Sequence, residues 1–194
     1  MYVVLEAILF ESPEIIEQAN EKEKPEMTAQ DVIEFIQLLD QNNIEIWIDG
    51  GWGVDALLGR QTRAHDDLDI AIQHKDVPLL RSLLGERGYA NVPRNDTWEC
   101  NFVLGDEQGH LIDVHSYTFD ADGNCVSGVK YPLASLSGSG TVNGFSVRCI
   151  SPKWMVKFHS GYELDQNDYQ DVMLLCQHFG MKIPCEYARF ENEQ

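Results

Sequence analysis

The amino-acid sequence predicts an α/β (α+β) fold, in which a short mixed β-sheet is flanked by helices and followed by a small helical C-terminal part. Two observations carry this prediction. Segments with helical spacing of apolar residues alternate with short strand-like segments over most of the chain, and only helical patterns follow near the C-terminus. Glycines end several of the helical segments. A chain of 194 residues can bury a substantial core without disulfides or metal staples.

The first helix is predicted to begin at Thr28. The segment "TAQD" has the pattern of a capping box, in which side chains at the helix start accept hydrogen bonds from the first free amides. Apolar residues then recur at helical spacing, at Val32, Phe35, Ile36 and Leu39. Residues 1–26 are acidic and weakly patterned, and we expect them to form an N-terminal extension.

Two strands and a glycine turn are predicted next. "IEIWID" (44–49) alternates apolar and polar residues, and "DLDIAI" (67–72) is a second apolar-rich strand. Between them, Gly50 and Gly51 break the first strand, and "WGVDALLG" has the pattern of a short helix that ends at Gly59. The turn thus connects a strand directly to a helix.

The middle of the chain is predicted to contain a helix and a hairpin. "VPLLRSLLGERG" has a helical pattern with a glycine stop, and "CNFVL" and "HLIDVHSY" form a hairpin around "GDEQG". The stretch 120–144 is rich in Gly and Ser, and we expect loop or irregular structure there.

The last third is predicted to hold one strand and two helices. "FSVRCI" is the strand, "SPKWMVKFHSGYE" has Ser and Pro at a helix start, and "NDYQDVMLLCQHFG" has Asn167 or Asp168 near its cap and Gly180 at its end. We therefore divide the chain into the extension, a core domain at 27–148 and a C-terminal helical region at 149–194.

Composition excludes several classes of function. The net charge of −18 repels phosphate backbones and favours cationic small molecules or metal ions, so no nucleic-acid partner is expected. The five cysteines are scattered without CxxC spacing, which is typical of free thiols in a reducing compartment. The acidic N-terminal segment lacks a basic leader, and no apolar run is long enough to span a membrane, so a cytoplasmic location is expected.

Three carboxylates are candidates for a metal site. Alternate side chains of a strand share a face, so Asp67 and Asp69 are expected to point the same way and Asp66 away from them. Their repulsion requires a compensating cation, and two Mg²⁺ ions would suit oxygen ligands at this spacing. Asp113 interrupts the apolar strand "HLIDVHSY" and is a candidate third carboxylate, because a buried Asp is costly unless it is paired or bound to metal. An acidic surface corner is the alternative.

Basic and glycine residues nearby are candidates for phosphate contacts. The Gly50–Gly51 turn would let backbone amides at a helix start approach a phosphate, although a plain turn is the alternative. Arg63 is a candidate phosphate contact between the turn and the acidic strand, and Lys157 is a candidate point charge for a triphosphate. A surface position is the alternative for both side chains.

The combined pattern resembles a known superfamily. "GGWGVDALLGRQTRAHDDLDI" is similar to the signature of the polymerase-beta-like nucleotidyltransferases, a glycine turn followed by DxD. Its specific form resembles the lincosamide nucleotidyltransferases and the aminoglycoside 2″-nucleotidyltransferases. "IDVH" is similar to their third-carboxylate strand, and "CISPKWMVKFHSGYELDQNDYQDV" to their C-terminal segment, so the resemblance covers roughly residues 28–180.

The resemblance implies a nucleotidyltransferase fold and a Mg²⁺-dependent transfer of a nucleoside monophosphate from ATP or GTP to an antibiotic hydroxyl. A lincosamide is the preferred acceptor and an aminoglycoside the alternative. It also implies that Gly50 and Gly51 contact the nucleotide, that Asp67 and Asp69 bind metal, and that Asp113 is a metal ligand or the general base.

Other readings of the same pattern stay open. They are a protein- or RNA-directed transferase and a non-catalytic nucleotide-binding module; the negative charge opposes an RNA acceptor, and the intact carboxylate set opposes a non-catalytic module. Trp98 and Glu99 precede the strand of Asp113 and are candidates for the acceptor pocket. A homodimer is possible from the resemblance.

Overall fold

The computed structural model describes residues 25–160 and 164–191. The predicted extension lies almost entirely outside the described residues, as does the end of the helix predicted in "SPKWMVKFHSGYE". The strands are β1 (Ile46–Ile48), β2 (Asp67–Gln73), β3 (Ala90–Val92), β4 (Asn101–Gly105), β5 (Leu111–Phe119), β6 (Cys125–Gly128), β7 (Gly138–Val142) and β8 (Phe145–Cys149). The helices are α2 (Ala29–Gln41), α3 (Gly50–Leu58), α4 (Val77–Gly85), α5 (Pro152–Phe158), α6 (Gln166–Phe179) and α7 (Ala188–Glu191), with short 3₁₀ turns at His74–Asp76, Leu133–Ser135 and Cys185–Tyr187.

All described strands join one mixed sheet, which confirms the predicted fold class. Seven of them follow in the order β3-β4-β5-β2-β1-β8-β7, and β6 pairs with the C-terminal end of β5. The centre of the sheet is mixed, because β2 is parallel to β5 but antiparallel to β1, while β1 is parallel to β8. The predicted hairpin of β4 and β5 is present as an antiparallel pair.

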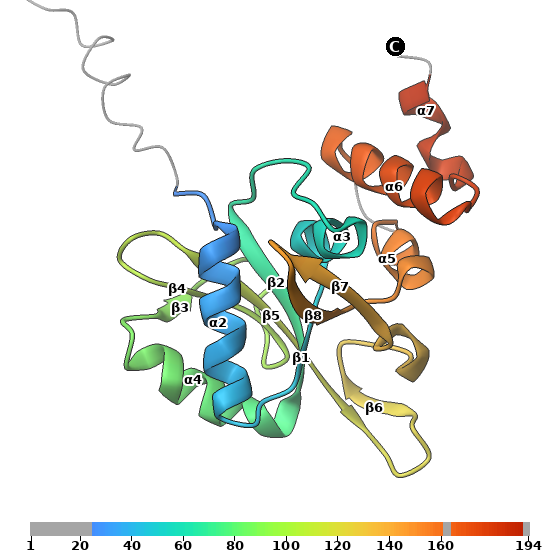
Figure 1. The fold of residues 1–194 in the computed structure, drawn as a ribbon. Coiled ribbons are helices and arrows are strands. Elements are labelled where there is room, and N and C mark those ends of the chain that lie inside the picture. The colour runs from blue at the N-terminus through green and yellow to red at the C-terminus, as the bar shows by residue number, and fades with distance from the viewer. Residues whose placement is uncertain (1–24, 161–163, 192–194) are drawn as a thin grey trace, which may run out of the picture.

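Helices lie on both sides of this sheet (Figure 1). Helices α2 and α4 lie side by side in front of the sheet in that view, and their residues line a shared groove. Helix α3 packs against β2 and β7, and α5 and α6 pack against α3 and each other. The core is therefore continuous from α2 through the sheet to the C-terminal helices.

The start of α2 confirms the predicted capping box. Thr28 is the N-cap residue, its side chain accepts from the amide of Asp31, and the Asp31 carboxylate accepts from the amide of Thr28. The predicted apolar face is buried in the core, with Val32 and Leu39 fully inaccessible. Capping and burial of one apolar stripe together explain why this segment is helical.

The expectation of irregular structure throughout 120–144 was wrong, because β6 and β7 lie within that stretch. Glycine is normally depleted in strands, and its presence here has a packing reason. A Cβ atom at Gly140 would lie 2.1 Å from the carbonyl oxygen of Ala56, so β7 can approach the backbone of α3 only without a side chain at this position. Residues 129–137 between the two strands are irregular apart from the 3₁₀ turn.

The C-terminal helices match their patterns with one correction. Helix α6 ends at Gly180, which has a left-handed conformation, as predicted. Its cap is Asp165 rather than Asn167 or Asp168, and Asp168 instead completes a capping box with Asp165. The division of the chain at residue 148 stays a prediction; that point falls inside β8, beside Cys149, which pairs with Ile48 of β1.

Among the described residues, no helix combines the length and the apolar character that crossing a bilayer requires.

The close approach of α3 and β7 makes a stability prediction. Gly140→Ala should destabilise the protein by about 1–3 kcal/mol or more, because the added methyl group meets rigid backbone and forces the helix away from the strand. Urea unfolding followed by circular dichroism measures this change. Gly85→Ala is the matched control: nothing lies within 4 Å of its Cβ position, so its stability should stay at or slightly above that of the unmodified protein. Equal unfolding midpoints for the two variants would contradict the packing account.

Candidate active site

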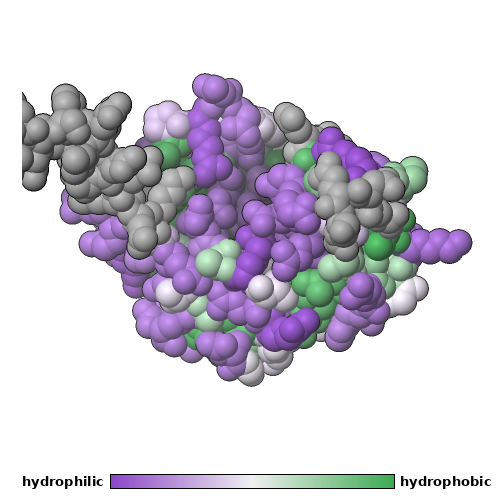
Figure 2. All heavy atoms as spheres, turned by 90° about the horizontal axis from the view of Figure 1, so that it is seen from above, coloured by the Kyte–Doolittle hydropathy of each residue, from purple (hydrophilic) through white to green (hydrophobic). Residues whose placement is uncertain are grey.

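A cavity of about 300 Å³ lies where the start of α3 faces the first half of β2. Seen from above, the molecule has a central hollow surrounded by hydrophilic residues (Figure 2). A volume of this size is at the lower end of the range for small-molecule sites. The cavity is lined by Asp49, Gly50, Gly51, Arg63, His65, Asp67, Asp69, His115, Phe158, His159 and Asp168.

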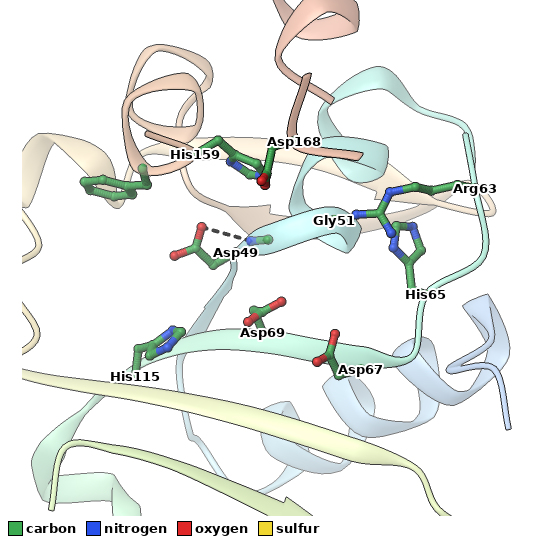
Figure 3. Close-up of a pocket in the computed structure, with 11 residues that line it drawn as sticks. Asp49, Gly51, Arg63, His65, Asp67, Asp69, His115, His159 and Asp168 are labelled. Atoms are coloured by element: carbon green, nitrogen blue, oxygen red, sulfur yellow. Dashed lines mark hydrogen bonds between the residues drawn. The ribbon is translucent and has the colours of Figure 1, made fainter. Parts of the chain in front are cut away.

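Two of the lining carboxylates come from one face of β2. Asp67 and Asp69 both point into the cavity (Figure 3), whereas Leu68 between them is fully buried on the opposite face. Asp66 is exposed and lies outside the lining. The strand alternation read from the sequence therefore separates the three aspartates as expected.

The third carboxylate is beside them on the neighbouring strand. Strand β5 runs parallel to β2, and Asp113 is the register partner of Asp69. Ligand atoms of Asp69, Asp113 and His115 lie within 4.8 Å of one another. The structure thus brings the three sequence-predicted carboxylates together and adds a histidine to them.

Burial raises the pKa of all three carboxyl groups, and a neighbouring carboxylate adds to each shift. The pKa of Asp69 is raised well above its usual value by burial first and by the charges of Asp67 and Asp113 next. Burial also raises the pKa of Asp67 and of Asp113, although nearby cationic groups oppose the shift at both. Such a cluster is charged at neutral pH only at a free-energy cost, which bound cations would relieve.

Arg94 supplies part of that compensation from the segment between β3 and β4. Its Nη1 donates to Oδ2 of Asp113 at 3.1 Å, and its Nη2 lies 3.9 Å from Oδ2 of Asp67. The guanidinium is partly exposed, so solvent screens its charge more than it screens the charge of Asp113.

The glycine pair forms the first turn of α3, directly opposite the acidic strand. Asp49 caps this helix by accepting from the amide of Gly50 at 3.0 Å, and Tyr131 donates to its other carboxylate oxygen at 2.7 Å. Gly50 has φ of +54°, and a Cβ there would lie 2.1 Å from Oδ2 of Asp69. A Cβ at Gly51 would lie 2.5 Å from Nδ1 of His65. Glycine is required at both positions for the helix start to sit this close to β2.

The segment between α3 and β2 is fixed by two buried carboxylates. Asp55 accepts from the side chain and amide of Thr62 and lies 2.6 Å from Nε2 of His65. Asp171 of α6 is buried and pairs with Arg63 at 2.9 Å, so the C-terminal helices hold one wall of the cavity.

Three of the remaining predicted residues lie outside the cavity lining. Lys157 is exposed and its Nζ lies 4.7 Å from the centre of the Trp154 ring. Trp98 is 50% exposed, and Glu99 lies 3.5 Å from His74. Their roles stay predictions, as do the catalytic and binding roles of the lining residues.

Sequence reasoning missed several groups at this site. His115 is two residues from Asp113 in the same strand, so strand alternation was a sufficient signal that both share a face. Asp49 ends the strand just before the glycine pair, a position that commonly caps a helix. No local pattern marks Arg94 or Tyr131, because each reaches the site from an irregular segment.

The raised pKa of Asp69 predicts a stability effect in the absence of metal. Its folded-state pKa exceeds the unfolded value near 4, so ionisation reduces the free energy of unfolding as the pH rises through this interval. Asp69→Asn should therefore raise the Tm at pH 7 by roughly 2–4 °C, the shift expected from about 1 kcal/mol in a domain of this size. The gain should shrink towards pH 4, where the carboxyl group is protonated.

Thermal unfolding in chelator at several pH values measures this effect. Asp66→Asn is the control, because Asp66 is exposed on the other side of the strand. A Tm for Asp69→Asn at or below that of the unmodified protein at pH 7 would refute the electrostatic account.

Comparisons with known proteins identify the family of the chain. Residues 31–175 match the sequence model of the family described as aminoglycoside-2''-adenylyltransferase. The chain is 28% identical over 152 residues to a lincosamide resistance protein of Staphylococcus haemolyticus, a match that covers 75% of this chain and 92% of that protein. It is 49% identical over 121 residues to a 2''-aminoglycoside nucleotidyltransferase of Klebsiella pneumoniae, covering 61% of this chain and 64% of that protein.

Solved structures share the fold. The lincosamide antibiotic adenylyltransferase LnuA, bound to lincomycin, superposes with a TM-score of 0.68 at 25% identity, over 78% of this chain and 98% of that one. ANT(2")-Ia in complex with adenylyl-2"-tobramycin superposes with a TM-score of 0.64 at 21% identity, over 78% and 89% of the two chains. With three quarters of its length matched by the family model, the chain belongs to the aminoglycoside-2''-adenylyltransferase family and is a nucleotidyltransferase.

Proposed function

We propose that this enzyme transfers a nucleoside monophosphate from ATP or GTP to a hydroxyl group of an antibiotic, with a lincosamide as the acceptor, in a Mg²⁺-dependent reaction. The observation that carries the proposal is the register of β2 and β5. It sets Asp69 beside Asp113, with Asp67 on the same face, across a cavity from the helix start at Gly50 and Gly51. This arrangement pairs a cation-binding wall with an anion-binding wall, as a metal-triphosphate complex requires.

The donor set fits hard divalent cations. The pKa values of the three carboxyl groups are raised by burial and by nearby carboxylates, which favours a bound cation, and carboxylate oxygens are the ligands that Mg²⁺ prefers. Asp67, Asp69 and Asp113 would hold two Mg²⁺ ions, which when bound supply charge neutralisation at the attacking and leaving oxygens of the α-phosphorus.

Asp113 is the candidate general base. The acceptor hydroxyl oxygen forms a bond to the α-phosphorus, the bond from that phosphorus to the bridging oxygen of pyrophosphate breaks, and the hydroxyl proton passes to a carboxylate. Burial raises the pKa of Asp113 and so makes it a stronger base than an exposed aspartate.

The phosphate contacts are proposed for the opposite wall. The Gly50 amide already donates to Asp49, so Gly51 is the stronger candidate of the two for donating to a phosphate oxygen. Arg63 lines the same wall and is held by Asp171, which fixes its guanidinium at the cavity. Lys157 would have to swing from the Trp154 ring to reach a triphosphate, and its flexible side chain allows this.

The lincosamide acceptor is supported by length as well as by likeness. The lincosamide resistance protein and LnuA are matched over 92% and 98% of their lengths. An aminoglycoside is the second candidate, favoured by the family model and by the 49% identity to the Klebsiella pneumoniae enzyme over its matched part. Both acceptor classes carry amines, and the exposed Trp98 and Glu99 offer an aromatic face and a carboxylate near the strand of Asp113.

Mass spectrometry tests the proposed acceptor directly. The protein is incubated with Mg²⁺, ATP or GTP, and lincomycin, clindamycin or a panel of aminoglycosides. We expect lincomycin to gain the mass of one nucleoside monophosphate with release of one pyrophosphate. A gain on aminoglycosides alone would replace the lincosamide proposal by the second candidate, and no gain on any antibiotic would refute both.

Substitution of the proposed base gives a further prediction. Asp113→Asn should lower kcat by about 10²–10⁴-fold, the range typical of a lost general base or metal-binding carboxylate. Steady-state kinetics with the antibiotic that accepts the nucleotide measure this loss, and circular dichroism checks the fold. Asp66→Asn is the matched control and should retain the activity, because Asp66 is exposed and lies outside the group formed by Asp69, Asp113 and His115. Activity within a few-fold of the unmodified enzyme in Asp113→Asn would contradict the assignment.

A further inference from the structure

The metal site proposed above uses three carboxylates and leaves His115, which lies beside them, without a role. We propose that a ring nitrogen of His115 is a direct metal ligand, and that it makes the site formed with Asp69 and Asp113 prefer a transition-metal ion such as Mn²⁺ over Mg²⁺. The inference rests on the proposed metal-dependent function and specifies which ion one of its positions takes.

The first argument is geometric. His115 and Asp113 are separated by one residue in β5 and therefore share one face of the sheet, and His115 lines the cavity (Figure 3). One ligand atom from each of His115, Asp113 and Asp69 lies within 4.8 Å of the other two. Three groups whose atoms converge in this way can bind one ion without movement of the backbone.

The second argument is that the imidazole lacks the partners that other histidines have. Nδ1 of His115 is buried without a hydrogen-bond partner among the described residues. Its Nε2 approaches Oδ1 of Asp113 only to 3.5 Å, which is long for a hydrogen bond. By contrast, ring nitrogens of four other histidines make hydrogen bonds of 2.6–2.9 Å, at His65, His74, His110 and His159. Among the described residues, neither ring nitrogen of His115 is held by a hydrogen bond of normal length, so Nε2, which faces Asp113, is available to a metal ion.

The third argument concerns the space on either side of Asp113. Arg94 donates to Oδ2 of this carboxylate, whereas His115 lies nearest to Oδ1. The two oxygens are thus divided between a permanent cation and the imidazole. The Oδ1 side is the one on which an ion would meet His115, and Arg94 need not leave for this to happen.

The donor chemistry then decides the class of ion. Mg²⁺ prefers oxygen ligands, whereas imidazole nitrogen favours the first-row transition metals. A site of two carboxylates and one imidazole therefore gains affinity for Mn²⁺, and more for Co²⁺, relative to Mg²⁺. The site is still compatible with Mg²⁺, which would use the carboxylates.

Electron spin-echo envelope modulation of bound Mn²⁺ tests the nitrogen ligand. The full-length protein is loaded with a sub-stoichiometric amount of Mn²⁺ without nucleotide or antibiotic. We expect ¹⁴N modulation from a directly bound imidazole, replaced by the ¹⁵N pattern in protein labelled with ¹⁵N-histidine. Modulation should disappear in His115→Gln and persist in His110→Gln, the matched control, because His110 is bonded to Asp106 away from the cavity.

Metal titrations test the preference. His115→Gln should weaken Mn²⁺ binding by about tenfold or more, since even residues that only orient metal ligands are worth that much, and should change Mg²⁺ binding far less. Absence of ¹⁴N modulation in the unmodified protein, or an equal Mn²⁺ to Mg²⁺ affinity ratio in both proteins, would overturn the inference. These measurements do not require turnover. Nitrogen ligation without nucleotide transfer to any antibiotic would contradict only the proposed function. Transfer without nitrogen ligation would contradict only this inference.

Discussion

The arrangement of the site follows from one constraint: two parallel strands hold aspartates side by side although their charges repel each other. Asp69 and Asp113 are register partners on β2 and β5, and Asp67 shares their face. Burial and nearby negative charges raise the pKa of each, so keeping these carboxyl groups ionised in the folded protein costs free energy that exposed aspartates would not cost. Elsewhere the same strands are apolar and fully buried, at Leu68, Ile70, Ile112 and Val114. The buried apolar residues of the sheet thus hold the carboxylates in place despite the free-energy cost of their charges.

The remaining parts of the site are arranged around that cluster. Gly50 lacks a side chain because Asp69 occupies the place of its Cβ, and Gly51 because His65 does. Asp55 fixes His65, and Asp171 of α6 fixes Arg63, so the opposite wall is held by buried carboxylates of its own. The C-terminal helices therefore contribute to the site although they supply only a few of its lining residues. A change in α6 is expected to reach the nucleotide wall through this ion pair.

The sequence predicts the parts of the site that lie within regular elements. Period-two alternation separates Asp67 and Asp69 from Asp66, and an aspartate inside an apolar strand identifies Asp113. The same alternation places His115, two residues after Asp113, on the same face of its strand. Arg94 and Tyr131 could not be predicted, because their reach into the site depends on irregular segments whose paths are set by tertiary packing.

The limits of local patterns appear again in the fold. The Gly- and Ser-rich stretch that contains β7 has the composition of a loop, yet it forms a strand that pairs with β8, and Gly140 lets this strand lie against the backbone of α3. The cap of α6 is Asp165, two or three residues before the predicted cap at Asn167 or Asp168. Pairing with a distant strand determines the structure in the first case, and the geometry of a single cap determines the start of the helix in the second. Local composition does not reveal either.

The central claim is that the carboxylate wall and the glycine wall form one site for a metal-bound triphosphate. A crystal grown with Mn²⁺ and a non-hydrolysable nucleoside triphosphate analogue tests it most directly through the anomalous scattering of the metal. The account predicts anomalous peaks within about 2–2.5 Å of carboxylate oxygens of Asp69 and Asp113, with phosphate oxygens at the amide of Gly51. Metal peaks away from these aspartates, or a triphosphate that does not contact the start of α3, would contradict it.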